Sequence, residues 1–145
     1  MAFGSTLALE RAYPETTWIQ RASRGANSDQ SALYFAEAPS GLVGLGGIVW
    51  FEHRWNVVSM WIDPAWRGRR LGGQLVDALV RWLDGTHPGS SLWLDVGARQ
   101  RSARRLYVSR GFRPTGRVLP LEHTPSEKLY EMVRRPRAFP ADGLS

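Results

Sequence analysis

The stretch from Val57 to Leu83 constrains this chain more than any other, because it predicts a strand, a turn and a helix in direct succession. Residues 57–62 are mostly apolar and β-branched, which is the composition of a buried strand. Asp63-Pro64 ends this strand, since proline cannot donate a ladder hydrogen bond. From Leu71 onward the apolar residues recur at the spacing of one helix face, so we expect a helix to begin there.

The turn between that strand and that helix is basic and rich in glycine, with the sequence Arg67-Gly-Arg-Arg-Leu-Gly-Gly. A strand that leads through such a turn into a helix points several free backbone N–H groups, and the positive end of the helix dipole, at one place. We therefore predict an anion site at residues 67–73, for a phosphate or pyrophosphate. On this segment alone, a basic surface loop that binds nothing is the alternative.

The length of 145 residues fits one domain, which we place at residues 1–135 with a C-terminal tail at 136–145. No apolar run reaches the roughly 18 residues that a membrane span needs. The N-terminus lacks a signal-peptide pattern, so a cytoplasmic location is expected. The chain has no cysteine, which excludes disulfides and cysteine-bound metal, and its histidines show no metal-ligand spacing.

The net charge is +6, and nearly all basic residues are arginine, with Lys128 as the lone lysine. Such a charge suits a polyanionic partner, either a nucleic acid or a phosphate-rich cofactor. Many of the arginines gather late in the chain, at Arg99, Arg101, Arg104, Arg105, Arg110, Arg113 and Arg117. No recognition-helix or RNA-binding motif accompanies them, and nucleic-acid binding would leave the glycine turn unexplained. We therefore rank nucleic acid below a cofactor.

The rest of the chain alternates strands and helices, which predicts an α/β or α+β sheet protein. In chain order we expect a helix over Pro14 to Arg24, a hairpin of strands over 31–37 and 42–51, a strand over 91–96, a helix over 101–109, and late strands over 112–119 and 128–134. The glycines at 44, 46 and 47 suggest a bulge in the second hairpin strand.

Two motifs, in this order, resemble those of the GCN5-related N-acetyltransferases (GNAT). The segment Ile62-Asp-Pro-Ala-Trp-Arg-Gly-Arg-Arg-Leu-Gly-Gly is similar to the acyl-CoA-binding motif of that family. The segment Gln100-Arg-Ser-Ala-Arg-Arg-Leu-Tyr-Val-Ser-Arg-Gly-Phe resembles its later Asn-x-x-Ala-x-x-Leu-Tyr-x-x-x-Gly-Phe stretch. The resemblance covers residues 31–135 and implies a GNAT-like acyl-CoA N-acyltransferase fold, a mixed central sheet flanked by helices.

The chain departs from the family pattern in three places. Arg70 stands where the first glycine of the turn motif is usual, and Gln100 replaces the common asparagine whose amide contacts the pantetheine arm. The chain also begins at a segment that a strand and a helix precede in the family, so we expect an N-terminally truncated fold. In that case the strand at 31–37 would be an uncovered sheet edge, which invites pairing with another chain. A homodimer through this edge, or a misplaced start site, would resolve the exposure.

The resemblance implies acetyl-CoA as co-substrate, with no metal, and direct transfer of its acetyl group to an amine. The backbone N–H groups of 67–73 would then hold the pyrophosphate, a side chain at Gly72 would obstruct this approach, and guanidiniums would add charge-assisted hydrogen bonds. A main-chain N–H near residues 60–62 would bind the thioester carbonyl. The predicted cofactor-binding residues are Ile62, Arg67, Gly68, Arg69, Arg70, Gly72, Gly73 and Gln100.

Tyr107 and Asp95 are the predicted catalytic residues. The resemblance gives the tyrosine of the Leu-Tyr pair the role of protonating the departing thiolate, although Tyr107 also fits a core aromatic. The attacking amine must be neutral, and some family members carry a glutamate base at the place of Asp95. The alternative for Asp95 is an ion pair with an arginine of residues 99–105. Glu52 and His53 are rival bases.

The acceptor stays open at this stage, among a small amine, an antibiotic, a peptide N-terminus and a protein lysine. An aromatic cluster on the same strands would either form a pocket for an apolar amine or pack as ordinary core and rim, and we favour packing; it comprises Trp50, Phe51, Trp55, Trp61 and Trp66. A domain that has kept the fold for binding or assembly after losing catalysis is a further hypothesis.

Overall fold

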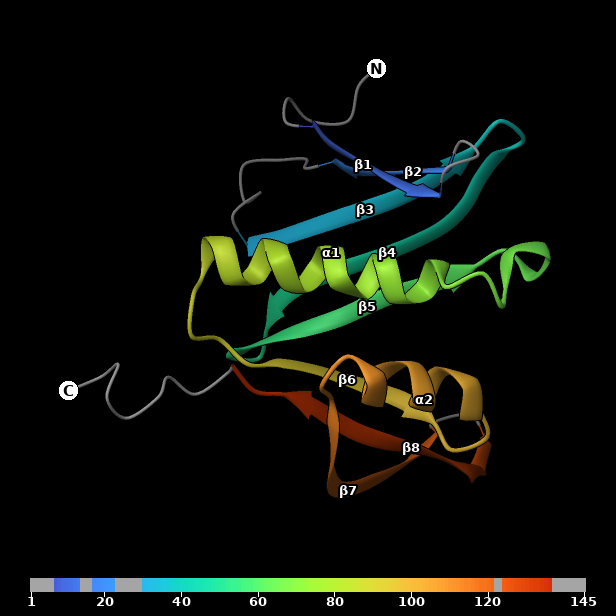
Figure 1. Cartoon of the computed structure of the whole chain (residues 1–145). Helices are drawn as coiled ribbons and strands as arrows, with labels where there is room; N and C mark the ends of the chain where they lie inside the picture. The colour runs from blue at the N-terminus through green and yellow to red at the C-terminus, as the bar shows by residue number, and fades with distance from the viewer. Residues whose placement is uncertain (1–6, 14–16, 23–29, 122–123, 137–145) are drawn as a thin grey trace.

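The computed structural model describes residues 7–13, 17–22, 30–121 and 124–136, with side chains described within 30–120 and 127–136. Over these ranges the chain forms one eight-stranded sheet with two α-helices (Figure 1). The elements are β1 (Leu7–Tyr13), β2 (Thr17–Ala22), β3 (Ser31–Ala38), β4 (Gly41–Phe51), β5 (Arg54–Ile62), a 3-10 helix (Pro64–Trp66), α1 (Leu71–Thr86), β6 (Leu92–Gly97), α2 (Arg101–Ser109), β7 (Arg113–Leu121) and β8 (Thr124–Arg134).

The sheet is mixed, with the strand order β1-β2-β3-β4-β5-β6-β8-β7. Neighbouring strands run antiparallel except β5 and β6, which are parallel and connected through α1. This confirms the predicted fold class, a mixed central sheet with helices. The helix predicted at 101–109 has those bounds, and the helix after the glycine turn begins at Leu71.

The helix predicted over Pro14 to Arg24 is wrong, because residues 17–22 form β2, between β1 and β3. The segment begins Thr-Trp-Ile, residue types that favour strands, and pairing on both sides outweighs its weak helical spacing. The remaining residues of that prediction lie outside the described ranges.

The uncovered edge predicted at 31–37 is also wrong. β3 pairs with β2 along one side and with β4 along the other, so it lies inside the sheet. The reason given for a homodimer through this strand therefore disappears.

Helix α1 packs its apolar stripe onto β3, β4 and β5. Leu71, Leu75, Leu79 and Leu83 are at most 1% exposed and follow the helix spacing. The glycines of β4 let the helix come close: a Cβ at Gly44 would lie 3.1 Å from the Leu75 Cδ1 atom. The predicted bulge in this strand is present beside Gly44, where the β3–β4 register shifts.

Helix α2 lies on the same face of the sheet as α1, in front of the sheet in Figure 1. The two helices touch, since the Arg110 Nε that follows α2 donates to Asp77 of α1 at 2.9 Å. In the described part of the chain no helix covers the opposite face, which we call the open face. No helix in these ranges is both long and apolar enough to cross a membrane.

Candidate functional site

The parallel strands β5 and β6 separate soon after they meet. Only two residue pairs join them, Trp55 with Leu92 and Asn56 with Trp93, while β5 continues to Ile62 and β6 to Gly97. Backbone groups of both strands are therefore left without a ladder partner on their facing sides. The result is a V-shaped gap that opens toward the end of β5, where residues 60–62 lie.

A bulge in β5 lies along this gap. The register shifts between Leu45 and Gly47 of β4, and Ser59 has a positive φ of 57°. Beyond the bulge, the Asp63 N–H donates to the Val43 carbonyl at 2.8 Å. Because ladder groups alternate in direction along a strand, the backbone of Ile62 faces the opposite side, toward the gap.

The glycine turn follows directly at the open end of the gap. The Asp63 carboxylate caps the 3-10 helix by accepting from the Ala65 N–H at 2.9 Å, and Gly68 and Arg70 then take positive φ angles of 81° and 65°. Helix α1 starts at the next residue, Leu71. No described group accepts a hydrogen bond from the backbone N–H groups of residues 68–73. The predicted row of free donors at a helix N-terminus is therefore present from residue 68 onward, whereas the Arg67 N–H, which the sequence also predicts to be free, donates to the Pro64 carbonyl at 3.3 Å.

Positive charge surrounds these donors. The first turn of α1 contains no acidic side chain, and Arg67, Arg69 and Arg70 are exposed with no carboxylate of the described residues in ion-pair range. The Arg67 Nε donates to the Ile62 carbonyl at 3.3 Å, and the Arg69 guanidinium lies 4.7 Å from the centre of the Trp66 ring. An anion at this helix end would meet both the dipole and three cations.

The two glycines in the first turn of α1 are explained by contact with α2. A Cβ at Gly72 would lie 2.9 Å from the Leu106 Cδ2 atom, and a Cβ at Gly73 would overlap the Arg110 guanidinium. Both contacts are on the inner side of the helix. Glycine is thus needed at these positions because the two helices pack closely. The sequence suggests another reason, namely that a side chain at Gly72 would obstruct the approach of the pyrophosphate.

Gln100 stands at the start of α2, where its side chain folds back on the end of β6. Its Oε1 accepts from the Gly97 N–H at 3.0 Å, and its own N–H donates to the Gly97 carbonyl at 3.0 Å. This pair of bonds closes the β6–α2 turn. The amide oxygen is therefore engaged locally, beside the open end of the gap.

Tyr107 lies on the inner face of α2 and is 7% exposed. Its ring meets Phe112 edge-on, with 5.6 Å between the ring centres. Burial raises the pKa of the Tyr107 hydroxyl above its usual value of 10.0, so this group holds its proton throughout the neutral range. The Tyr107 hydroxyl, which the sequence predicts to be the acid, is therefore protonated at neutral pH.

Asp95 lies on β6, two residues beyond Trp93, where β5 and β6 have just separated. Its neighbours Leu94 and Val96 point into the core, so the exposed Asp95 faces the open side of the sheet. Partial burial and the nearby Glu131 carboxylate raise the pKa of Asp95, while Arg54 and Arg117 act in the opposite direction. The alternative partner for Asp95, an arginine of residues 99–105, forms no ion pair with it.

The rival bases Glu52 and His53 lie at the other end of β5. They form the two-residue turn between β4 and β5, with φ angles of 53° and 64°. This turn precedes the paired end of β5, away from the open end of the gap. Within the described ranges, no three acidic, histidine or cysteine side chains gather as metal ligands.

The predicted aromatic cluster does not form one pocket. Trp55 is 5% exposed and packs against Trp50 and Trp82, with ring centres 5.3 Å and 5.5 Å away. Trp61, by contrast, is 40% exposed further along β5. Trp50 and Phe51 are also exposed, at 40% and 61%, and Trp66 packs partly buried against the core. Only Trp55 of this set is therefore a core residue.

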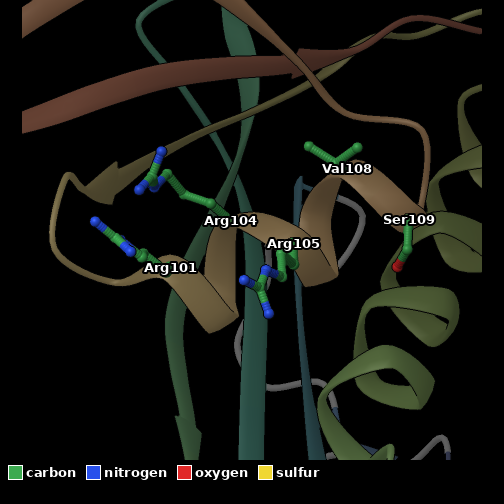
Figure 2. Close-up of a pocket in the computed structure, with 5 residues that line it drawn as sticks. All are labelled: Arg101, Arg104, Arg105, Val108 and Ser109. Atoms are coloured by element: carbon green, nitrogen blue, oxygen red, sulfur yellow. The ribbon is translucent and has the colours of Figure 1, made fainter.

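The late arginines are divided among several roles. Arg110 pairs with Asp77, Arg113 donates to the Phe112 carbonyl at 2.8 Å, and Arg117 lies 3.9 Å from Glu131. Those on α2 line a surface hollow of about 410 Å³ together with Val108 and Ser109; Figure 2 shows Arg101 and Arg104 extending to the same side of the helix. Arg110, Arg113 and Arg117 thus contact other residues of the chain, which reduces the continuous basic surface that nucleic-acid binding would need.

The described residues form a mixed sheet in which one parallel pair of strands separates beside a helix N-terminus with free N–H donors. This chain therefore has the acyl-CoA N-acyltransferase fold. The sequence matches the acetyltransferase (GNAT) family over residues 5–112, and the chain belongs to that family. A comparison with curated protein sequences gave no match.

Solved structures support the same assignment of the fold. A GNAT-family acetyltransferase from Streptococcus pneumoniae superposes with a TM-score of 0.68 at 20% identity, covering 77% of this chain and 70% of that one. The ribosomal-protein-S18-alanine N-acetyltransferase from Escherichia coli gives 0.64 at 18% identity, covering 82% and 76%. Arabidopsis thaliana NAA60, solved with a bisubstrate analogue, gives 0.65 at 17% identity, covering 76% and 78%.

Sequence reasoning missed Glu131, the one charged residue among the described side chains that is buried, at 5% exposure. It lies on β8 directly opposite Asp95 and binds Arg54 at 3.1 Å. A carboxylate between the apolar neighbours Tyr130 and Met132 is a signal that the sequence offers, since a buried charge requires a partner.

Proposed function

We propose that this chain transfers an acetyl group from acetyl-CoA to a primary amine by direct transfer. The observation that carries the proposal is the position of the free donors of residues 68–73 at the open end of the β5–β6 gap. The pyrophosphate would bind these donors and the nearby guanidiniums of Arg67, Arg69 and Arg70, and the pantetheine arm would lie in the gap. Acetyl-CoA supplies the activated acetyl group as a thioester.

Tyr107 is the proposed acid for the leaving thiolate. Because its burial keeps the hydroxyl protonated at neutral pH, a proton is available when the C–S bond breaks. No described residue accepts a hydrogen bond from this hydroxyl, so the group is not committed to a structural bond.

Asp95 is the proposed base for the attacking amine. As the new C–N bond forms, the amine loses a proton to the Asp95 carboxylate, directly or through a water molecule, while the thiolate takes the proton of Tyr107. The raised pKa of Asp95 makes this carboxylate a stronger base than an ordinary aspartate. Its position on the open face implies that the acceptor approaches from that side of the sheet.

The acceptor class to test first is an α-amine. An α-amine has a pKa near 8, about two units below that of lysine, and therefore needs less help from a carboxylate base. The similar E. coli enzyme is by its name an alanine N-acetyltransferase, which favours the same choice. The cytoplasmic location stays a prediction.

Two measurements test the proposal. Acetyl-CoA should raise the melting temperature in a saturable manner, and release of free thiol should depend on an added amine from a panel of peptides, small amines and lysine peptides. Tyr107→Phe should lower kcat by about 10²-fold with acetyl-CoA binding retained. Tyr130→Phe is the matched control, since it removes a hydroxyl from the neighbouring β8 and should keep turnover.

The outcomes separate the hypotheses. Absence of acetyl-CoA binding would overturn the whole proposal. Saturable binding without turnover on any amine would instead favour a binding or assembly module that has lost catalysis. Normal turnover in Tyr107→Phe would remove the acid role and leave the cofactor assignment intact.

A further inference from the structure

We propose that Glu131 is a positioning residue that holds Arg54 and Arg117 on its own carboxylate and so keeps Asp95 free of a cationic partner. The catalytic part of this inference rests on the proposed function, in which Asp95 is the base. The electrostatic part concerns the folded chain alone and can be measured without turnover.

The sheet register places the two carboxylates next to each other. Asp95 of β6 and Glu131 of β8 are direct partners in the antiparallel ladder. Directly opposite residues have Cβ atoms about 4.5–5.5 Å apart on one face of the sheet. The residues that flank them, Leu94 opposite Met132, are buried on the helix side. Two acidic side chains therefore share the open face just where β5 and β6 separate.

Arg54 reaches Glu131 from two strands away. It begins β5, and its guanidinium lies 4.4 Å from the centre of the Trp93 ring on β6, so the side chain crosses that strand on the open face. At the far side its Nη1 donates to the Glu131 Oε2 at 3.1 Å, and its Nε donates to the Asn56 side chain at 3.2 Å. Three neighbours, namely Trp93, Asn56 and Glu131, thus orient the guanidinium, and its ion pair is with Glu131.

A bulge in β7 supplies two more contacts to Glu131. Pro114 pairs with Met132 and Val118 with Tyr130, so the residues between them arch out of the ladder. From this arch the Thr115 hydroxyl donates to the Glu131 Oε1 at 2.9 Å, and the Arg117 Nη1 lies 3.9 Å from Oε2. A carboxylate that is 5% exposed is in this way supplied with donors from two other strands.

Asp95 is left without an ion pair of its own. The charged groups that act on it are Glu131 on β8, Arg54 on β5 and Arg117 on β7. Arg104 of α2 lies over the Tyr130 ring and lines a hollow with Arg117 and Glu131, but it does not act on Asp95. Partial burial and Glu131 raise the pKa of Asp95, and the two arginines lower it. Were Glu131 neutral, the same two guanidiniums would have Asp95 as their nearest acidic neighbour, and a carboxylate paired with arginine is a weaker base.

The test is Glu131→Gln, which keeps the shape of the side chain and one acceptor oxygen, replaces the other oxygen by an NH2 donor, and removes the charge. The Asp95 carboxyl carbon is titrated by NMR in the full chain without added ligand, and its midpoint should fall by about one pH unit. The acidic limb of kcat/KM against pH should move down by the same amount. An unchanged midpoint in a folded variant would overturn the proposal.

Two further variants complete the design. Thr115→Val removes a hydrogen bond from Glu131 without changing any charge, so the Asp95 midpoint should stay in place; a shift as large as that of Glu131→Gln would assign the effect to packing and overturn the proposal. Arg117→Met removes an exposed cation and should move the Asp95 midpoint upward, which provides a test if Glu131→Gln does not fold. A downward move there would contradict the proposal.

The failures are distinguishable. If the Asp95 midpoint shifts as expected but no amine is acetylated by any variant, the electrostatic role of Glu131 stands and the proposed function fails. If turnover is present and its acidic limb stays fixed while the Asp95 midpoint moves, Asp95 is not the base and the catalytic part of the inference is overturned.

Discussion

The residue just before α1 offers a direct test of how the anion turn is built. Arg70 has φ 65° and ψ 12°, the left-handed conformation, and its side chain makes no capping hydrogen bond. For a residue with a Cβ atom, this conformation raises the free energy of the folded state by about 1–2 kcal/mol. Glycine avoids that strain but loses about 0.5–1 kcal/mol more backbone entropy on folding. Arg70→Gly should therefore stabilise the fold by a net amount of about 0.5–1 kcal/mol.

Thermal and urea unfolding measure this gain. For a chain of this size, a change of 1 kcal/mol moves the melting temperature by about 2–4 °C, so an increase of about 1–4 °C is expected. The matched control is Arg70→Ala, which removes the same charge and side chain but keeps the Cβ atom and hence the strain. Acetyl-CoA titration of both variants then measures the contribution of the guanidinium separately, because the free N–H groups are unchanged.

The result that would refute this reasoning is a Gly variant no more stable than the Ala variant. In that case the left-handed conformation at Arg70 would carry no measurable strain. A loss of acetyl-CoA affinity confined to the Gly variant would show in addition that the turn depends on a restricted backbone here.

Two further predictions come from the helix contact and from Asp95. Gly72→Ala should destabilise relative to Gly85→Ala by about 1–3 kcal/mol in urea unfolding, because a Cβ at Gly72 crowds Leu106 at 2.9 Å whereas one at Gly85 meets nothing within 4 Å; equal stabilities would contradict this packing. Asp95→Asn should raise the melting temperature at pH 7 and slow turnover. Folding raises the pKa of Asp95, so ionisation of this carboxyl group destabilises the folded state as the pH rises above the usual value of 3.8. The higher stability of the asparagine variant should therefore vanish in acid. A pH-independent difference between the two proteins would refute the linkage.

The central part of the fold is predictable because local signals agree there. The β-branched run of residues 57–62 and the proline at 64 indicate a strand end at 62, and the apolar spacing indicates a helix start at Leu71; the structure has both. The strand begins earlier than predicted, at Arg54. Helix α2 likewise follows from its spacing and from Gly111, which takes the positive φ of 97° that a helix-ending glycine favours.

The N-terminal region is not predictable in the same way. Residues 17–22 show both a loose helical spacing and strand-forming residue types, and the choice between them depends on β1 and β3 on either side. Such pairing is a property of the whole sheet. The same information decides that β3 is an interior strand, which no local pattern in residues 31–37 encodes.

The candidate site likewise has one part that the sequence predicts and one part that only the fold reveals. The donors of residues 68–73 follow from a contiguous motif, so sequence alone locates them. The neighbourhood of Asp95 instead depends on the register between β6 and β8, on a bulge in β7, and on a side chain from β5 that crosses a strand. Glu131 lies 36 positions after Asp95 in the numbering, and only the folded register makes them neighbours.

The two pairs that join β5 to β6 make a narrow seam through the molecule. On one side lies an antiparallel lobe with α1, and on the other an antiparallel lobe with α2. The helix contact and the Arg54–Glu131 ion pair also connect the two lobes. A molecule bound along this seam would contact both lobes at once and would connect them where the sheet itself has few hydrogen bonds. Cofactor occupancy should therefore slow amide hydrogen exchange in β6 and β8 as well as at the turn that holds the diphosphate, so that a local binding event stiffens the lobe beyond the seam.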